Sequence, residues 1–342
     1  MDYVKLLEQF APYCAFHRDE TSIPIAWETI KNNSELLISA DGKQVTLPKE
    51  YISKLDTSSP QEIIEDWLKS NEENRATFAN GQLILMPNQD AAEMQGDFDD
   101  KKNIKSLPVH TLVSDVTLKN SEGVDEEFYR LTYVFLYRDN DPDFAFNAGD
   151  HRGDLEHVHF YIRKSKNENG YEDSIYKAYY GAHGEIEGQW FRGDQLKYEN
   201  NHPVIFLAKG SHAVYKDLNT GFPFFSSTHY VPRVFGFASD KIEKAIVYQI
   251  KGSDLRPMPK PIKENAKIKF GGITLGKDFI KGPEKVFNAN SLVRQIPTTL
   301  KIGNWVLWEP KNHVVQEKHD ERVENLHDLK NEESNPSSPN LN

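Results

Sequence analysis

The stretch that decides the fold is residues 149–162, which read GDHRGDLEHVHFYI. It joins a polar loop to a segment with the two-residue period of a β-strand. One face of this expected strand carries Asp154, Glu156, Val158, Phe160 and Ile162. The other face carries Leu155, His157, His159, Tyr161 and Arg163. One face therefore begins with two carboxylates and continues as core.

Two carboxylates on an apolar face repel each other and are costly to desolvate unless a cation or strong donors lie between them. His151 lies just before the strand, and Asp143 lies upstream in an Asn-Asp-Pro-Asp run. A site with the ligands Asp143, His151, Asp154 and Glu156 would bind a divalent cation, with calcium or magnesium favoured and manganese or zinc as alternatives. The other interpretation of these residues is a surface loop in which Arg152 neutralises the carboxylates.

Composition bounds the class of protein. The chain has 342 residues, of which 38% are hydrophobic and 11% aromatic, which suffices for a substantial core. The abundance of tyrosine and phenylalanine favours strands. The formal net charge of −11 argues against nucleic acid as a partner and favours attraction to cations.

Cysteine usage and hydropathy indicate a cytoplasmic protein. Cys14 is the only cysteine, so no internal disulfide is expected and a reducing compartment fits. The first residues lack the basic and apolar regions of a signal peptide, and no run approaches the length of a membrane span. We therefore expect a soluble, cytoplasmic protein, with export by a non-classical route as the alternative.

The order of the patterns predicts a mainly β fold, an antiparallel β-sandwich with helical N-terminal additions. Helices are expected over residues 3–10 and 26–37 and after Ser59, which precedes Pro60 and acidic residues. Short β-branched or aromatic runs then follow at residues 109–118, 128–137, 155–162, 174–180, 204–208 and 245–250. We expect one decorated domain over residues 1–310, helical and mixed over 1–105 with a β core over 106–310, and a charged, disordered tail over 311–342.

Two histidines lie between small residues directly after expected strands. His183 stands in Gly-Ala-His-Gly and His212 in Gly-Ser-His-Ala. Each alone is more typical of a structural hydrogen bond, but the pair predicts a solvent-facing cleft near Asp154 and Glu156. Near the start of the chain, His17, Asp19 and Glu20 are also ligand types, with capping or ion pairing as the favoured role for Glu20 and its neighbours.

Four ordered blocks resemble the vacuolar protein sorting-associated protein 62 family. They are Ala11-Pro12-Tyr13 with Phe16-His17, Glu20 and Pro24; the aromatic run at 131–137 with Asn140; the block at 149–158; and His202-Pro203-Val204 followed by the Gly-Ser-His-Ala block that ends at Tyr215. His183 falls where that family has a histidine-glycine pair. The resemblance covers roughly residues 3–308 and implies no particular activity.

The central block is also similar to the Gly-His-Arg-His-Asp-Trp-Glu heptapeptide of the necrosis-inducing (NPP1-like) cytolysins, β-sandwich proteins that bind a divalent cation. This likeness implies a metal-binding role for His151, Asp154 and Glu156, with Asp143 at the corresponding upstream spacing. Gly153 stands in place of a histidine of that heptapeptide, and Leu155 in place of its tryptophan.

These observations lead to one favoured function and two others. We expect a cation-binding protein that recognises a small molecule, a glycan or a lipid head group, with no nucleic-acid partner, no transmembrane segment and at most peripheral membrane contact. The alternative is a metal-dependent hydrolase of phosphoester or ester substrates, with a metal-activated water and with His183 or His212 as the catalytic residue that moves protons. In a third hypothesis the cation only stabilises the fold.

Overall fold

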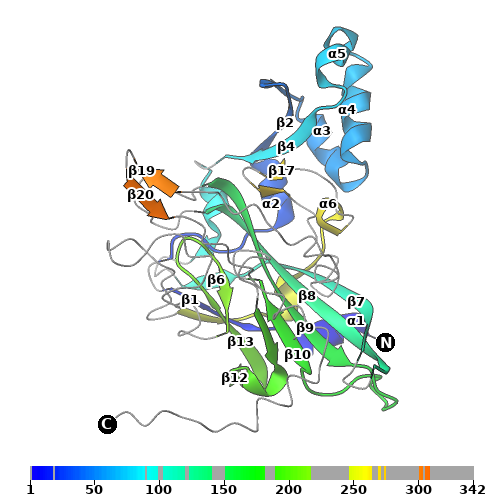
Figure 1. Cartoon of the computed structure of the whole chain (residues 1–342), viewed down its shortest axis with the longest axis vertical. Coiled ribbons are helices and arrows are strands. Elements are labelled where there is room, and N and C mark those ends of the chain that lie inside the picture. The colour runs from blue at the N-terminus through cyan, green and yellow to red at the C-terminus, as the bar shows by residue number, and fades with distance from the viewer. Residues whose placement is uncertain are drawn as a thin grey trace.

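A six-stranded sheet, built around the hairpins of β7, β8 and β9, organises the fold (Figure 1). The computed structural model describes residues 2–17, 20–88, 91–98, 103–119, 123–140, 151–181, 189–216, 246–263, 269–270, 273–274, 300–302 and 305–308. The strands of the sheet, in spatial order, are β11 (Gln189–Arg192), β10 (Lys177–Tyr180), β9 (His151–Arg163), β8 (Asp125–Asn140), β7 (Val109–Lys119) and β16 (Leu255–Pro257). All neighbours are antiparallel except β16 and β7. Residues 131–137 of β8 are buried without a break, which is typical of a strand covered on both faces.

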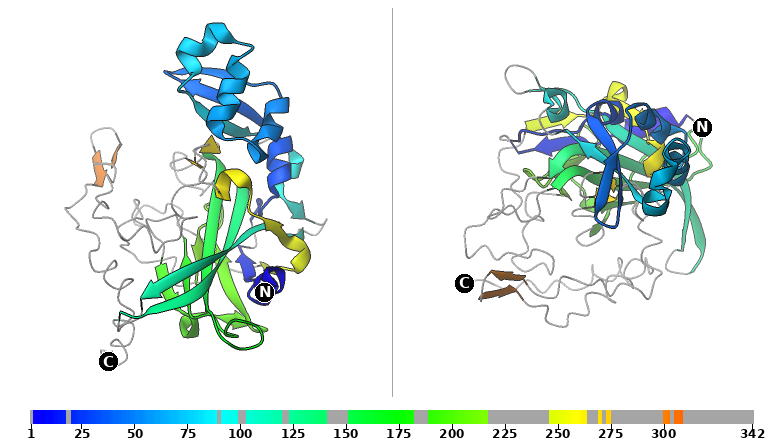
Figure 2. Two further views of the ribbon diagram at one scale, coloured as in Figure 1. Left: turned by 90° about the vertical axis from the view of Figure 1, so that its right-hand side faces the viewer. Right: turned by 90° about the horizontal axis from the view of Figure 1, so that it is seen from above.

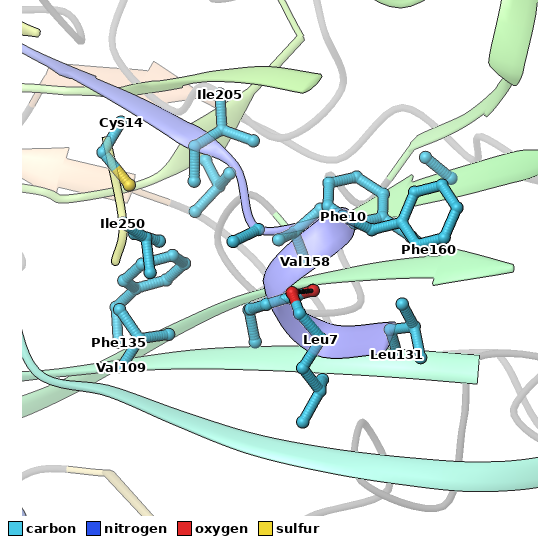
Figure 3. Close-up of a cluster of buried hydrophobic side chains, with 14 of the residues drawn as sticks. Leu7, Phe10, Cys14, Val109, Leu131, Phe135, Val158, Phe160, Ile205 and Ile250 are labelled. Atoms are coloured by element: carbon cyan, nitrogen blue, oxygen red, sulfur yellow. Dashed lines mark hydrogen bonds between the residues drawn. The ribbon is translucent and has the colours of Figure 1, made fainter. Parts of the chain in front are cut away.

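One face of the six-stranded sheet packs against a second, mixed sheet. The strands of this second sheet are β12 (Tyr198–Glu199), β13 (His202–Leu207), β1 (Tyr13–Phe16) and β15 (Ile246–Gln249), with β14 (Val214–Tyr215) paired to β13. Cys14 and Ile205 of this sheet share one core with Phe135 and Val158 of the other. Figure 3 shows these side chains meeting beside helix α1 (Tyr3–Gln9), whose first turn is capped by the Asp2 carboxylate. Two sheets over one core form the predicted sandwich.

The opposite face of the six-stranded sheet is covered at one end by the N-terminal region (Figure 2). Its strands β4 (Gln82–Pro87), β2 (Ser34–Ala40) and β3 (Lys43–Thr46) form a third sheet. Two short strands from later in the chain, β18 (Ile273–Thr274) and β17 (Lys269–Phe270), extend this sheet beside β4. The helices of this region are α2 (Trp27–Asn32), α3 (Glu50–Ser53), α4 (Pro60–Leu68) and α5 (Arg75–Phe78). Ile38 and Trp67 of this region share a second core with Leu136 of β8 and Leu155 of β9.

The remaining elements are short. They are the strands β5 (Asp97–Phe98), β6 (Ile104–Ser106), β19 (Leu300–Ile302) and β20 (Trp305–Trp308), helix α6 (Lys260–Lys263), and the 3-10 turns Lys54–Asp56, Glu72–Asn74, Ala92–Gln95, Gly193–Gln195 and Gly252–Asp254. In the part of the chain that the structure describes, no helix is long and apolar enough to cross a membrane.

The mainly β fold with helical N-terminal additions is confirmed, and so is the helix after Ser59. The Ser59 hydroxyl accepts the Glu62 N–H and the Glu62 carboxylate accepts the Ser59 N–H, which is a capping box. The predicted helix over residues 26–37 was wrong in its extent. α2 ends at Asn32 because residues 34–40 pair with β3 and β4, and this pairing buries Leu36 and Ile38. The predicted tail over 311–342 lies outside the described residues.

Candidate functional site

The alternation predicted for residues 154–162 is confirmed. Asp154 lies opposite Tyr137 of β8, and Glu156 lies opposite Phe135. Their face continues into the sandwich core with Val158, whereas the neighbouring Leu155 belongs to the core on the other side. Both carboxylates are buried, with 6% of Asp154 and 4% of Glu156 exposed. Strand β9 therefore carries two acids into the end of the sandwich core.

His212 reaches this place from the second sheet. It lies in the turn between β13 and β14, which is closed by hydrogen bonds from the Ala208 N–H to the Ala213 carbonyl (3.1 Å) and from the His212 N–H to the Ala208 carbonyl (3.0 Å). His212 has a φ of 56°, and Gly210 in the same turn has a φ of 70°. A left-handed backbone costs a non-glycine residue about 1 kcal/mol, so the contacts of the turn must hold His212 in place.

The imidazole of His212 is held on two sides. Nδ1 lies 2.9 Å from Oδ2 of Asp154, and the ring stacks on that of Tyr137 with centroids 3.8 Å apart and planes within 5°. The other carboxylate oxygen of Asp154 accepts the Leu155 N–H (2.8 Å). Burial alone would lower the pKa of His212. The hydrogen bond to Asp154 and the negative charges of Glu20, Asp154 and Asp139 outweigh burial, so the pKa lies above the usual range of histidine.

Two polar atoms of this stacked pair have no hydrogen-bond partner within the described part of the chain. They are Nε2 of His212 and the hydroxyl oxygen of Tyr137, and both are inaccessible to solvent. Burial, together with the nearby carboxylates of Asp154, Glu156 and Glu20, raises the pKa of Tyr137, so its hydroxyl stays protonated. A buried polar atom without a partner is uncommon in folded proteins, so each of these two atoms calls for an explanation.

Acidic side chains surround the pair. Besides Asp154 and Glu156, Glu20 and Asp139 are buried and contribute to the negative potential at His212. Arg138 neutralises Asp139 through an ion pair of 2.6 Å. Glu20 instead accepts backbone N–H groups, as the capping role favoured for it from the sequence requires. The cluster thus concentrates negative charge where a low dielectric strengthens its effect.

Only some of the predicted site residues lie in the part of the chain that the structure describes. Asp143 and His183 lie outside the described residues, and His151 begins β9, where its backbone pairs with Asn140. His212 contacts Asp154, as predicted. The expectation of a solvent-facing cleft was wrong for His212, which is 1% exposed because Tyr137 covers its ring. Among the described residues, no three or more histidine, cysteine or acidic side chains are grouped to hold a metal ion, so the four-ligand set stays a prediction.

The sequence patterns did not indicate Tyr137 or Asp139 as residues of the site. The two-residue period of β8 places both on the same face as Tyr133 and Phe135, which was the available signal. What the sequence does not contain is the pairing register that sets Tyr137 opposite Asp154. It also does not contain the turn that brings His212 onto the tyrosine ring.

A groove lies next to the first residues of β9. Its volume is about 610 Å³, and its lining includes Asn32, Asn33, Ser34, Asn88 and Arg152. Arg152 precedes Asp154 by two residues, and its guanidinium reaches the Pro87 carbonyl (3.5 Å). Amide, hydroxyl and guanidinium groups in one groove can bind hydroxyl and anionic oxygen atoms of a ligand.

The chain was compared with known proteins at the level of families, sequences and structures. It matches no family model, no curated protein and no solved structure. The likeness to the vacuolar protein sorting-associated protein 62 family and to the cytolysins therefore stays a prediction from the sequence blocks.

Proposed function

We propose that the chain binds a divalent cation at the start of β9 and uses it to recognise a glycan or lipid head group. The observation that carries this proposal is the buried pair of His212 and Asp154, in which Nδ1 faces the carboxylate and Nε2 has no partner among the described residues. Histidine ligands of metals generally donate their second ring N–H to a carboxylate, which fixes the ring and leaves the other nitrogen for the metal.

The described residues would supply part of the coordination of such an ion. Nε2 of His212 and the carboxylate of Glu156 would be ligands, and Asp154, whose oxygens accept the Leu155 N–H and face Nδ1 of His212, would orient the imidazole. Asp143 and His151 are the further ligands predicted from the sequence. Oxygen-rich sets favour calcium or magnesium, and the imidazole admits manganese or zinc. The cation would supply the positive charge that offsets the buried carboxylates and would attract ligand oxygens.

The groove beside β9 supports recognition of a head group. Arg152 belongs both to the groove lining and to the segment that leads into Asp154. A ligand lying in the groove would meet the asparagine amides with its hydroxyl groups and Arg152 with an anionic oxygen. In this proposal the protein acts in the cytoplasm, and contact with a membrane is peripheral.

The test is metal content and affinity in matched variants. Elemental analysis and calorimetric titration with Ca²⁺, Mg²⁺, Mn²⁺ and Zn²⁺ should detect a bound ion in the wild type. Asp154→Asn and Glu156→Gln should each weaken its affinity about 10- to 100-fold. Glu126→Gln is the control, because it removes a carboxylate paired with Arg163 (2.9 Å) at the other end of the same two strands. Unchanged metal content in both site variants refutes the proposal.

The orientation of His212 supports the second candidate, a metal-dependent hydrolase. A carboxylate that holds Nδ1 leaves Nε2 in the position of a general base, as in carboxylate-histidine pairs of hydrolases. In this alternative Nε2 takes the proton of the attacking water, and the carboxylate of Asp154 stabilises the resulting imidazolium. Turnover of phosphoesters or esters that is lost in His212→Ala and Asp154→Asn would identify the enzyme. Cation binding without turnover would favour the cation-binding protein over the hydrolase.

A further inference from the structure

Tyr137 differs from the other buried tyrosines that line the same sheets. The hydroxyl of Tyr133 donates to the Leu7 carbonyl (2.8 Å), that of Tyr171 to Gln9 (2.8 Å) and that of Tyr248 to Asp254 (2.9 Å). The hydroxyl of Tyr137 has no partner within the described residues, although the side chain is fully buried. The hydroxyls of these three tyrosines are thus satisfied, whereas that of Tyr137 has no partner in the part of the chain that the structure describes.

Packing alone does not require a tyrosine at this position. Phe135 lies two residues earlier on the same face of β8 and is equally buried, so an aromatic ring without a hydroxyl fits this strand. A phenylalanine at position 137 would keep the stack on His212 and would remove an unsatisfied polar atom, whose burial is unfavourable. With no partner among the described residues, the buried hydroxyl is unfavourable, and a ligand that accepts its hydrogen bond would offset this.

The position of Tyr137 suggests what that ligand is. The ring lies opposite Asp154 on the neighbouring strand and in parallel contact with His212, whose Nε2 also has no partner among the described residues. A phenol offers one hydrogen-bond donor and one acceptor oxygen, and this phenol belongs to the ring that stacks on His212. Such a donor suits an oxygen atom, either of a ligating carboxylate or of the bound head group.

We propose that Tyr137 is a further binding residue of the cation site. Its ring holds the imidazole of His212 by stacking, and its hydroxyl donates to an oxygen atom in the ligand shell of the cation. This inference rests on the proposed function, because it assigns a role at the same site. It extends that function by adding a neutral hydrogen-bond donor to a cluster otherwise composed of acids and one histidine.

The test compares two tyrosines of the same strand. Tyr137→Phe should leave the melting temperature of the cation-free protein unchanged or higher, and should weaken calorimetric binding of Ca²⁺ and Mn²⁺ about 10- to 100-fold. Tyr133→Phe, the matched control, removes a satisfied hydroxyl from the same face. It should lower the melting temperature and leave the affinity for both ions as in the wild type.

Three other outcomes would contradict the inference. Wild-type affinity in Tyr137→Phe overturns the inference and leaves the proposed function intact. A loss of affinity together with a lower melting temperature of the cation-free variant also overturns it, because the fold would then be the cause. A wild-type protein that binds neither ion overturns both the proposed function and this inference, whatever the variants do.

Discussion

Glu20 joins two segments that are 190 residues apart in the chain. Its carboxylate accepts the Gly210 N–H (2.8 Å) on one oxygen and the N–H groups of Thr21 (2.8 Å) and Ser22 (3.0 Å) on the other. Because Gly210 lies two residues before His212, the carboxylate fixes the turn that presents the imidazole. Glu20 therefore acts through the position of His212 as well as through its charge.

Replacing Glu20 by glutamine should loosen this turn. The amide keeps one accepting oxygen but turns an NH₂ group towards backbone donors, so at least one buried N–H loses its partner, at a cost of about 1 to 3 kcal/mol. Urea denaturation should show this loss, and hydrogen exchange should show faster exchange at residues 208–213. Slow exchange at the Gly210 amide, equal to that of the wild type, would show that Glu20 does not hold the turn.

The residues of the site were predictable in unequal measure. Asp154 and Glu156 followed from the two-residue period alone, because both their position and their shared face are local properties. The contact between His212 and Asp154 was a hypothesis, and it depended on which strands are neighbours. Tyr137 could not be recognised in advance, since an unsatisfied hydroxyl is defined by every atom around it and leaves no trace in the local pattern.

Helix α2 depends on a histidine from another element for its first turn. It has no side-chain cap of its own, and the Trp27 N–H donates instead to Nε2 of His110 in β7 (3.1 Å). Nδ1 of His110 lies 3.2 Å from the Pro257 carbonyl of β16 and donates to it. This arrangement requires a neutral imidazole. Burial outweighs the hydrogen bond to Pro257 and, with the charge of Arg256, lowers the pKa of His110 to about 4.

This pKa makes stability depend on pH in a defined window. Because the folded pKa lies below the ordinary value of about 6.5, the stabilisation is fully present above pH 6.5 and is lost as the pH falls towards 4. The contribution of His110 is about 3 kcal/mol by this difference.

A glutamine at position 110 tests the dependence on pH. Its carbonyl oxygen can accept the Trp27 N–H but does not titrate, so the free energy of unfolding in His110→Gln should fall less between pH 7 and pH 5. His157, whose pKa burial lowers to about 3, contributes to the same window in both proteins, so the difference between them is the measurement. Equal slopes in the two proteins would contradict the assigned role of His110.

At the level of elements, local signals located most strands but not their assembly. Residues 109–118, 128–137 and 155–162 were predicted as strands and lie within β7, β8 and β9. Residues 34–37 were predicted to be helical, but they belong to β2, which pairs with β3 and β4. Their joining with β17 into a third sheet was not predictable, because β17 is only two residues long and comes from the far end of the chain. Short strands of this kind gain their stability from pairing and not from propensity.

The six-stranded sheet serves two cores at once. Successive residues of β8 point to opposite faces, so Leu131 packs in the sandwich core while Leu136 packs against the N-terminal region. Both leucines are fully buried on the same strand. We expect a sheet shared in this way to couple the two parts of the molecule, because β8 contributes buried side chains to both cores.

The two leucines therefore form a matched pair for testing cooperativity. Leu131→Ala and Leu136→Ala should each lower the free energy of unfolding by about 2 to 5 kcal/mol, and both should shift a single urea transition. Hydrogen exchange of β4 and β13 reports on the two parts separately and should change together in both variants. If Leu136→Ala accelerates exchange in β4 alone, the N-terminal region is an independently folding unit.

At the scale of the whole molecule, the sequence pattern predicted a mainly β sandwich but not what covers its outer face. The alternation of residues 154–162 predicted one face that begins with two carboxylates and continues as core, and it did not predict that the other face would be covered. The carboxylates of Asp154 and Glu156 marked the face of β9 that carries the acidic cluster. That the N-terminal helices cover the other face required knowledge of tertiary contacts.

The contact between Asp154 and His212 crosses from one layer of the sandwich to the other, since Asp154 belongs to β9 and His212 to the turn after β13. A ligand that binds only when this pair is intact would hold the two layers together. By mass action, the free energy needed to separate the sheets would grow with the logarithm of the ligand concentration. A mechanical load that slides one layer past the other would separate Asp154 from His212 and would therefore release the proposed ligand.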